Sequence, residues 1–448
     1  MANCRFIDRL GITEQEFLQE TKGEYSTSFF HIYTKGDFDT DLSKISQTDR
    51  GTFIHEYIHY WQNIATLWGL STSIFCYDCM QKLVNEFETL DEIKLPYSIT
   101  YSESMKRRSD IFNIGNGETN DNVFANKKID TSHRIQIKFG ISNVDGRTIP
   151  TVSLKIVFDD GNTYDIALGA HIIKESMAAL YQSLVDPNAE HDDMPYNIVR
   201  ILCLHNYPSL YNNKKLLICC CHASLFSMTP GDTLIDLLAK AEKEEISDGM
   251  QLFNNYINES HIHAGGEDNI SILDFFDGMA NSFLIKLDKN LRSELDYIKT
   301  VLSRVRLSNK MLPLLTVLYE EPSDTISNDN LNSIIGWLGI PFVHSLTQGH
   351  YFPSTTKKVD DPNTEVSEDA SMDVLELIAL ETMFKFLTKE CPYRCCPLYG
   401  MMCSDSSYSK PECFDTPWLG DDCIFTLVSE PLKLKGKNVH WQLLIKSN

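Results

Sequence analysis

The stretch TFIHEYIHYWQN, from Thr52 to Asn63, contains His55, Glu56 and His59 in the order H-E-x-x-H. Residues four apart lie one turn apart on the same face of a helix, so the two imidazoles can point at one ion. Glu56 stands beside them, where its carboxylate can take a proton from a metal-bound water. The stretch therefore predicts a helix that carries two ligands and the general base of a zinc hydrolase.

The residues around this motif predict that the helix lies inside the protein. Ser46 and Asp49 form an N-terminal capping signal, and the helix is then expected to run to about Trp68. A second helix is predicted from about Ser71 to Thr89. Two histidines and a glutamate in a buried helix are costly unless they have partners. A metal ion would be such a partner, whereas the alternative is a pair of core histidines with satisfied hydrogen bonds.

A catalytic zinc ion normally has three protein ligands and one open position, so a third ligand must lie elsewhere in the chain. Glu175, within HIIKESMAAL, has His171, Ile172, Ala178 and Ala179 as its neighbours on a helix face. That face holds no Lys or Arg, and a buried carboxylate needs a partner. The small alanines would let this helix approach the H-E-x-x-H helix closely. We favour Glu175 as the third ligand.

Two other residues remain open as the third ligand. Glu86, within KLVNEFET, lies on the next predicted helix, and its surroundings resemble the N-E-x-x-S/T signature of thermolysin-like enzymes. However, Lys82 precedes Glu86 by one helical turn and is a natural ion-pair partner for it. His171, one turn before Glu175, could donate a hydrogen bond to a ligand or bind the metal itself. It could equally be a capping or core histidine.

The two helices together carry a family resemblance. HEYIHYWQ, followed much later by KESMAAL, resembles the zincin metallopeptidases, specifically the Glu-liganded gluzincins, and is similar to uncharacterised bacterial proteins with an HEYxHxxQ helix. The resemblance implies that His55, His59 and Glu175 bind Zn²⁺ and that Glu56 is the general base. Gluzincins usually place the third ligand within a few tens of residues, whereas a long stretch intervenes here. That stretch would be an insertion, or the sheet against which the site packs.

The hydrophobic pattern of the whole chain predicts an α+β fold that is mainly helical. RIQIKFGIS, TIPTVSLKIVF and TYDIAL alternate apolar and polar residues and are separated by NVDG and DDGN, which predicts a three-stranded antiparallel meander. Its last strand leads into the helix of Glu175, and the chain is then mostly helical to about Leu346, with long helices near 231–246 and 271–306. We expect a zincin-like fold with this small antiparallel β-meander and a cysteine-rich C-terminal segment.

Shorter stretches predict further local structure. STSFFHIYT (26–34) predicts a strand at a sheet edge, where a peptide substrate could add as a further strand. Residues 102–133 are polar and rich in Asn and Gly, so we expect a loop or insertion there, with Lys106-Arg107-Arg108 as a solvated basic run. TEQEFLQET (13–21) predicts a short helix, and KLKGKN (433–438) predicts the turn of a C-terminal hairpin.

These elements suggest a division of the chain into five parts. The predicted parts are an N-terminal strand with the H-E-x-x-H helix (1–98), a polar loop with the meander (99–168), a helical domain with the third ligand (169–352), a flexible linker (353–370) and a helix with a cysteine-rich module (371–448).

The cysteines indicate a reducing compartment. Three of the thirteen are consecutive in an apolar run, Cys219 to Cys221, where neighbouring residues of one helix are poorly placed to form a bridge. The C-x-x-C pair of Cys76 and Cys79 is expected to pack within a helix. Six more lie near the C-terminus and form either a reduced packing module or a second zinc site. These are Cys391, Cys395, Cys396, Cys403, Cys413 and Cys423.

Composition and charge exclude several classes of protein. The formal charge of −22 argues against a nucleic-acid-binding surface, which needs clustered Lys and Arg. We find no secretory signal and no apolar run of transmembrane length, so we expect a cytoplasmic protein without a membrane partner. The sequence leaves the oligomeric state open.

The sequence thus predicts an intracellular zinc metallopeptidase, an endopeptidase that cleaves a protein partner. Two alternatives remain: a metal-stabilised binding or scaffold protein without activity, and a zinc hydrolase that acts on a non-peptide amide. A non-ligand glutamate such as Glu56 has no purpose at a closed structural site, which favours catalysis. The residue that stabilises the oxyanion is left open among four candidates, namely His222, His344, His350 and Tyr351.

Overall fold

The computed structural model describes residues 23–26, 31–263, 269–290, 296–311, 313–320, 325–345, 347–351 and 428–441, with short helical pieces between 377 and 388. Over these residues the protein is a mixed helix-and-sheet fold in which helices predominate, which confirms the predicted α+β class. The predicted helix at 13–21, the linker at 353–370 and the cysteine-rich segment from Cys391 to Cys423 lie outside the described residues.

Helix α3 (Gln47–Ala65) contains the H-E-x-x-H motif and is buried along most of its length. Ser46 caps it as predicted, because its hydroxyl accepts the Asp49 backbone N–H at 3.1 Å. The helix ends at Ala65, and α4 (Leu67–Glu88) follows at once. The predicted boundary between the two helices was several residues too late. The chain already starts α4 at Leu67, because the Thr66 hydroxyl caps this helix by accepting the Gly69 N–H at 3.0 Å.

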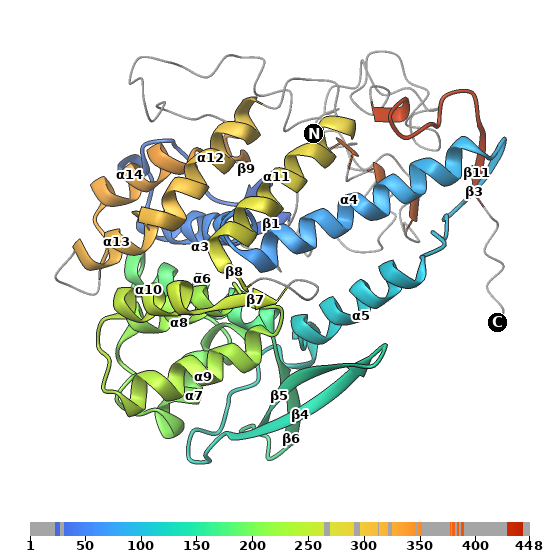
Figure 1. Ribbon diagram of the computed structural model, residues 1–448. Helices are drawn as coiled ribbons and strands as arrows, with labels where there is room; N and C mark the ends of the chain where they lie inside the picture. The colour runs from blue at the N-terminus through green and yellow to red at the C-terminus, as the bar shows by residue number, and fades with distance from the viewer. Residues whose placement is uncertain are drawn as a thin grey trace.

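Helix α3 lies between two groups of helices (Figure 1). On one side it packs against α6 (Ala170–Val185), and on the other against α12 (Asp296–Met311). The other helices that follow α6 are α7 (Ile198–Asn206), α8 (Lys214–Ser224), α9 (Pro230–Lys243), α10 (Gly249–Glu259), α11 (Ile272–Asn290), α13 (Pro313–Glu320) and α14 (Asn328–Leu338). Helix α8 buries Cys219, Cys220 and Cys221 as free thiols, as predicted.

A four-stranded sheet covers part of α3. Its order is β1-β2-β9-β10, formed by β1 (Gly23–Ser26), β2 (His31–Thr34), β9 (Phe342–Ser345) and β10 (Gly349–Tyr351). The prediction of a single edge strand over 26–34 was wrong. The chain reverses between Ser26 and His31, which pair in an antiparallel hairpin, and β2 lies inside the sheet beside the parallel β9. The alternation of apolar and polar residues within one strand cannot reveal that a strand as distant in sequence as β9 will pair with β2.

The predicted meander is confirmed as β4 (Gln136–Val144), β5 (Arg147–Val157) and β6 (Thr163–Leu168), paired antiparallel in that order. Asp145 and Gly146 between the first two strands have φ angles of 52° and 76°, the left-handed conformations that a tight two-residue hairpin needs. Because β6 leads through Gly169 directly into α6, the meander fixes where the helix of Glu175 begins.

The prediction of a loop over 102–133 was wrong for its first half. Residues Glu103–Asn116 form α5, which begins where the Ser102 hydroxyl accepts the Met105 N–H and ends at Gly117, with a φ of 72°. Only one residue of this helix is fully buried, so its sequence lacks the apolar stripe that would have predicted it.

The basic run on α5 is also not a solvated loop. Arg107 pairs with Asp145 at 2.7 Å, and Arg108 pairs with Asp78 at 2.6 Å. The two ion pairs connect α5 to the meander on one side and to α4 on the other.

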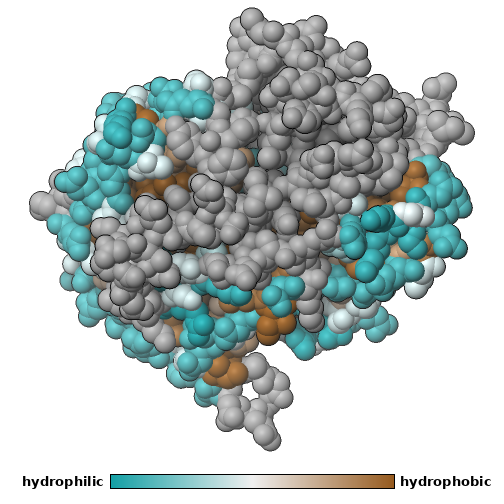
Figure 2. Space-filling model, turned by 90° about the horizontal axis from the view of Figure 1, so that it is seen from above, coloured by the Kyte–Doolittle hydropathy of each residue, from teal (hydrophilic) through white to brown (hydrophobic). Residues whose placement is uncertain are grey.

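The predicted C-terminal hairpin was wrong as well. Strand β11 (Asn438–Trp441) pairs in parallel with β3 (Glu92–Leu95), far away in sequence, and the residues just before it form turns. Among the described residues no helix is long and apolar enough to cross a membrane. On the face shown in Figure 2, hydrophobic residues appear at several separate places between hydrophilic ones.

Candidate metal centre

Three side chains from α3 and α6 converge at one point. The Glu175 Oε2 atom lies 3.4 Å from His55 Nε2 and 3.2 Å from His59 Nε2. One potential ligand atom from each residue falls within 4.8 Å of the others. The structure thus brings together the three residues that the sequence predicted as ligands, and the cluster could bind a metal ion.

The packing of α6 explains why Glu175 reaches the H-E-x-x-H helix. Ala178 and Ala179 are buried and small, as the close approach of α6 to α3 requires. On another part of the same helix, the Ser176 hydroxyl donates a hydrogen bond to the Pro195 carbonyl at 2.8 Å. This bond holds the segment that follows α6 against the helix of Glu175.

The electrostatics of the cluster couple the carboxylate to the imidazoles. Burial raises the pKa of Glu175, but the neighbouring His59 and His55 outweigh it and hold that pKa well below its usual range. For His59, burial lowers the pKa, but the Glu175 carboxylate reverses this and the net pKa is raised. The carboxylate is thus held in its ionised form, in which it can bind a cation.

The donor set fits a metal ion such as zinc. Two imidazole nitrogens and a carboxylate oxygen are ligands that Zn²⁺ takes at catalytic sites. With neutral imidazoles, two nitrogen lone pairs and an anionic oxygen would crowd into this space, and a cation between them removes the repulsion. His55 is buried, and its second ring nitrogen, Nδ1, has no hydrogen-bond partner among the described residues.

Gln62 sets the protonation of His59. The Gln62 Nε2 amide donates to the Lys174 carbonyl at 3.0 Å, which turns Gln62 Oε1 toward His59 Nδ1 at 2.9 Å. Because the amide oxygen can only accept, Nδ1 carries the proton in the neutral imidazole, and Nε2 then keeps its lone pair. The free lone pair is on the nitrogen that faces Glu175, as metal binding requires.

Replacing Gln62 with leucine is expected to weaken the binding of a metal ion to the cluster by about 10- to 100-fold, the usual cost of losing a partner that orients a ligand. Gln81→Leu, on α4, is the matched control because, among the described residues, the hydrogen bond of Gln81 goes to Asn85 near the surface. Competition with a chromophoric chelator measures both affinities. Equal affinities for the two variants would contradict the orienting role of Gln62.

Glu56 is buried on α3 directly after His55. Its charge is one of the causes that raise the pKa of both His59 and Tyr196, so the carboxylate lies close enough to both to act on them. It does not belong to the group of three converging ligands.

Sequence reasoning missed two aromatic residues beside the cluster. The ring of His55 lies 5.6 Å from that of His191 and 5.8 Å from that of Tyr196, between centroids. Both belong to the segment that Ser176 holds against α6, which includes the single π-helical turn η3 (Asp193–Asn197). No spacing or motif in the sequence marks them, because only the packing of this segment on α6 brings them near His55.

Tyr196 is suited to donate a hydrogen bond. Burial raises the pKa of its phenol, and the nearby carboxylates of Glu175, Asp121, Glu56 and Asp192 raise it further. A negative charge on the phenol is disfavoured in such surroundings. Tyr196 therefore keeps its proton at all ordinary pH values.

The two alternative third ligands lie outside the cluster. Glu86 pairs with Lys82 at 3.1 Å and accepts the Thr100 N–H, so it is held on α4. His171 bonds Asp121 through Nε2 at 2.9 Å. Among the described residues, only the predicted Glu175 joins the two histidines in a group of possible ligands.

Of the four predicted oxyanion candidates, His222 is the one whose side chain lies in the described part of the structure. His222 on α8 is fully buried between the rings of Trp61, at 4.0 Å, and Phe253, at 5.0 Å. Burial lowers its pKa well below the usual range, and neither ring nitrogen has a partner among the described residues. It is a neutral core histidine. His344, His350 and Tyr351 lie on the paired strands β9 and β10.

Comparison with known proteins does not assign this site to a family. No family model, no curated protein and no solved structure matches the chain. The class of site therefore rests on its own geometry, with two histidines one helical turn apart, a carboxylate from a second helix and a glutamate beside the first histidine.

Proposed function

We propose that this protein is a zinc-dependent metallopeptidase of zincin-like fold, in which His55, His59 and Glu175 hold the ion and Glu56 is the general base. The observation that carries the proposal is the convergence of Glu175 on the two histidines of the H-E-x-x-H helix. The gluzincin resemblance of the two helices supports the same ligand set.

Each residue of the site has a separate task in amide hydrolysis. A bound zinc ion would polarise the scissile carbonyl and lower the pKa of water to about 7. Glu56, one residue after His55, accepts a proton from the attacking water and passes it to the leaving amine. Gln62 keeps His59 in the tautomer that presents Nε2.

Tyr196, which was not among the candidates from the sequence, is the residue that we assign to the developing oxyanion. Its phenol keeps its proton and lies near both Glu56 and Glu175. Tyr196→Phe is expected to lower kcat by about 100-fold, the cost of one oxyanion donor, and to leave bound zinc unchanged. Tyr211→Phe is the control, because the contact of Tyr211 with Arg200 is made by its ring, which phenylalanine keeps. A wild-type kcat for Tyr196→Phe would show that this role belongs to another residue.

The reaction is tested with zinc-loaded protein and a mixture of synthetic peptides, with products identified by mass spectrometry. We expect cleavage of internal peptide bonds by the wild type and none by Glu56→Gln. Hydrolysis of small non-peptide amides alone would mean that the protein is a different zinc hydrolase and not a peptidase. Bound zinc without any hydrolysis would favour the metal-stabilised scaffold. The proposed cytoplasmic location agrees with the buried free thiols of the described residues.

A further inference from the structure

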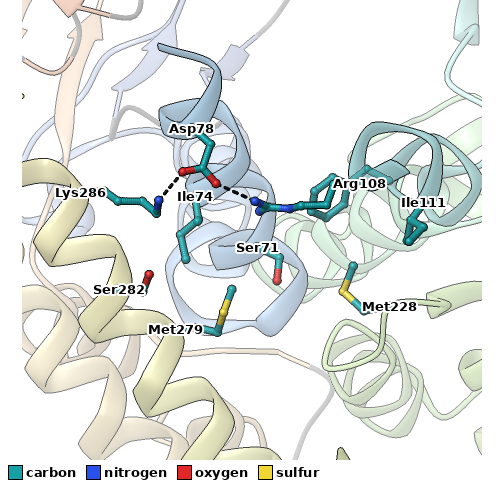
Figure 3. A pocket seen from close by; sticks show the side chains of 10 residues that line it. Ser71, Ile74, Asp78, Arg108, Ile111, Met228, Met279, Ser282 and Lys286 are labelled. Carbon is teal, nitrogen blue, oxygen red and sulfur yellow. Dashed lines mark hydrogen bonds and ion pairs between the residues drawn. The ribbon is translucent and has the colours of Figure 1, made fainter. Parts of the chain in front are cut away.

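A pocket lies between α4, α5 and α11, and it shares no residue with the candidate metal cluster. Its volume is about 430 Å³, within the range of small-molecule sites. Figure 3 shows a charged end, with Asp78, Arg108 and Lys286 in a row, and a mainly apolar end that also holds Ser71 and Ser282. This division is typical of pockets that take amphipathic ligands.

The charged end consists of two cations that share one carboxylate. Asp78 on α4 accepts from Arg108 of α5 at 2.6 Å and also pairs with Lys286 of α11 (Figure 3). Two cationic side chains thus flank one carboxylate at this end of the pocket.

Arg108 has hydrogen-bonding capacity to spare. A guanidinium carries five N–H donors, and among the described residues the bond from Nη1 to Asp78 is the only hydrogen bond that Arg108 makes. The rings of Phe75 and Phe112 lie 5.1 and 6.0 Å from its central carbon and hold the group in place. The remaining donors are therefore fixed in position at a pocket wall, where they can bind an anion.

The apolar end suits a flat ring. Ile74, Ile111, Met228 and Met279 line it, and Figure 3 shows the two thioethers beside the space below the charged row. Met228 is 39% exposed, so an apolar side chain stands uncovered here. Methionine sulfur makes favourable contacts with aromatic rings, and its flexible side chain adapts to them.

We propose that this pocket binds a small aromatic carboxylate, with the carboxylate on Arg108 and the ring against Met228 and Met279. A planar carboxylate matches the two-pronged geometry of a guanidinium. Asp78 repels a doubly charged phosphate more strongly than a singly charged carboxylate, which favours the carboxylate. The proposal does not rest on the peptidase function.

The test uses 2-naphthoate as the probe and 2-naphthamide as its neutral counterpart, in calorimetric titrations of the full chain. We expect naphthoate to bind at least ten times more tightly than the amide. Arg108→Gln is expected to weaken naphthoate binding at least tenfold. Arg107→Gln changes the adjacent residue, which pairs with Asp145 instead, and is expected to have no effect.

Arg108→Lys keeps the charge but loses the two-pronged geometry, so it decides the case if Arg108→Gln does not fold. It is expected to bind naphthoate less tightly than the wild type while unfolding at nearly the same temperature. Three results would each overturn the proposal. They are no binding of naphthoate up to about 10 mM, equal binding of naphthoate and naphthamide, and equal effects of the Arg107 and Arg108 variants on naphthoate binding. The zinc content of the same samples is measured as well, so that a failure of naphthoate binding is distinguished from a failure of the metal site.

Discussion

Glu56→Gln is expected to lower kcat by about 10³-fold, within the range of about 10²–10⁴ that a positioned general base contributes. The amide of glutamine is nearly the same size as the carboxylate but cannot accept the proton of the attacking water. Zinc content is expected to stay at the wild-type level, because Glu56 is not among the three converging ligands. The measurement is steady-state hydrolysis of a peptide that the wild-type protein cleaves.

Glu86→Gln is the matched control for this substitution. Glu86 is also a glutamate on a neighbouring helix, but it pairs with Lys82 away from the cluster. Its variant should hydrolyse the peptide at the wild-type rate. An active Glu56→Gln enzyme would remove Glu56 as the base, and loss of zinc from that variant would mean that Glu56 helps to hold the ion.

Removal of a ligand is expected to have the second large effect. Glu175→Ala and His59→Ala should each lower zinc affinity by more than about 100-fold, beyond the loss that a residue orienting a ligand would cause. Each substitution takes one of three donors from the cluster. Elemental analysis of zinc per chain after gel filtration gives the result directly, and peptide hydrolysis should disappear with the metal.

The two rejected ligands supply the controls. Glu86→Ala and His171→Ala should retain zinc, because the first residue pairs with Lys82 and the second with Asp121. If His171→Ala lost zinc while Glu175→Ala kept it, the third ligand would have been assigned to the wrong residue of α6.

The three residues of the candidate metal cluster could be predicted from the sequence because each was chosen from local information. His55 and His59 are one turn apart on a helix whose cap, Ser46, is also visible in the sequence. Glu175 was favoured because a carboxylate on an apolar, alanine-rich helix face needs a partner. The structure places it 3.2 Å from His59. The meander was predictable for the same reason, since its turns join strands adjacent in sequence.

The surroundings of the site could not be predicted because they depend on packing between distant segments. His191 and Tyr196 approach His55 only through the way their segment lies on α6. His222 is an attractive oxyanion candidate by residue type, yet its ring is enclosed by Trp61 and Phe253. Residue type alone does not tell a reactive histidine from a core histidine.

Secondary structure was mispredicted where stabilising contacts are long-range or polar. Helix α5 lacks an apolar stripe and is held in part by the ion pairs of Arg107 and Arg108. Strand β11 pairs with β3, and β9 pairs with β2, each across a large sequence separation. Periodicity reports which face of an element is apolar, but it does not report which element will cover that face.

X-ray diffraction of zinc-loaded crystals, recorded just above and just below the zinc absorption edge, tests the central claim most directly. The predicted result is one anomalous peak bonded to His55 Nε2, His59 Nε2 and a Glu175 carboxylate oxygen, at the 2.0–2.2 Å that zinc takes with such donors. A crystal of protein with about one zinc per chain but no peak between these three residues would contradict the account. The H-E-x-x-H stretch would then be a core helix that carries two histidines without a metal.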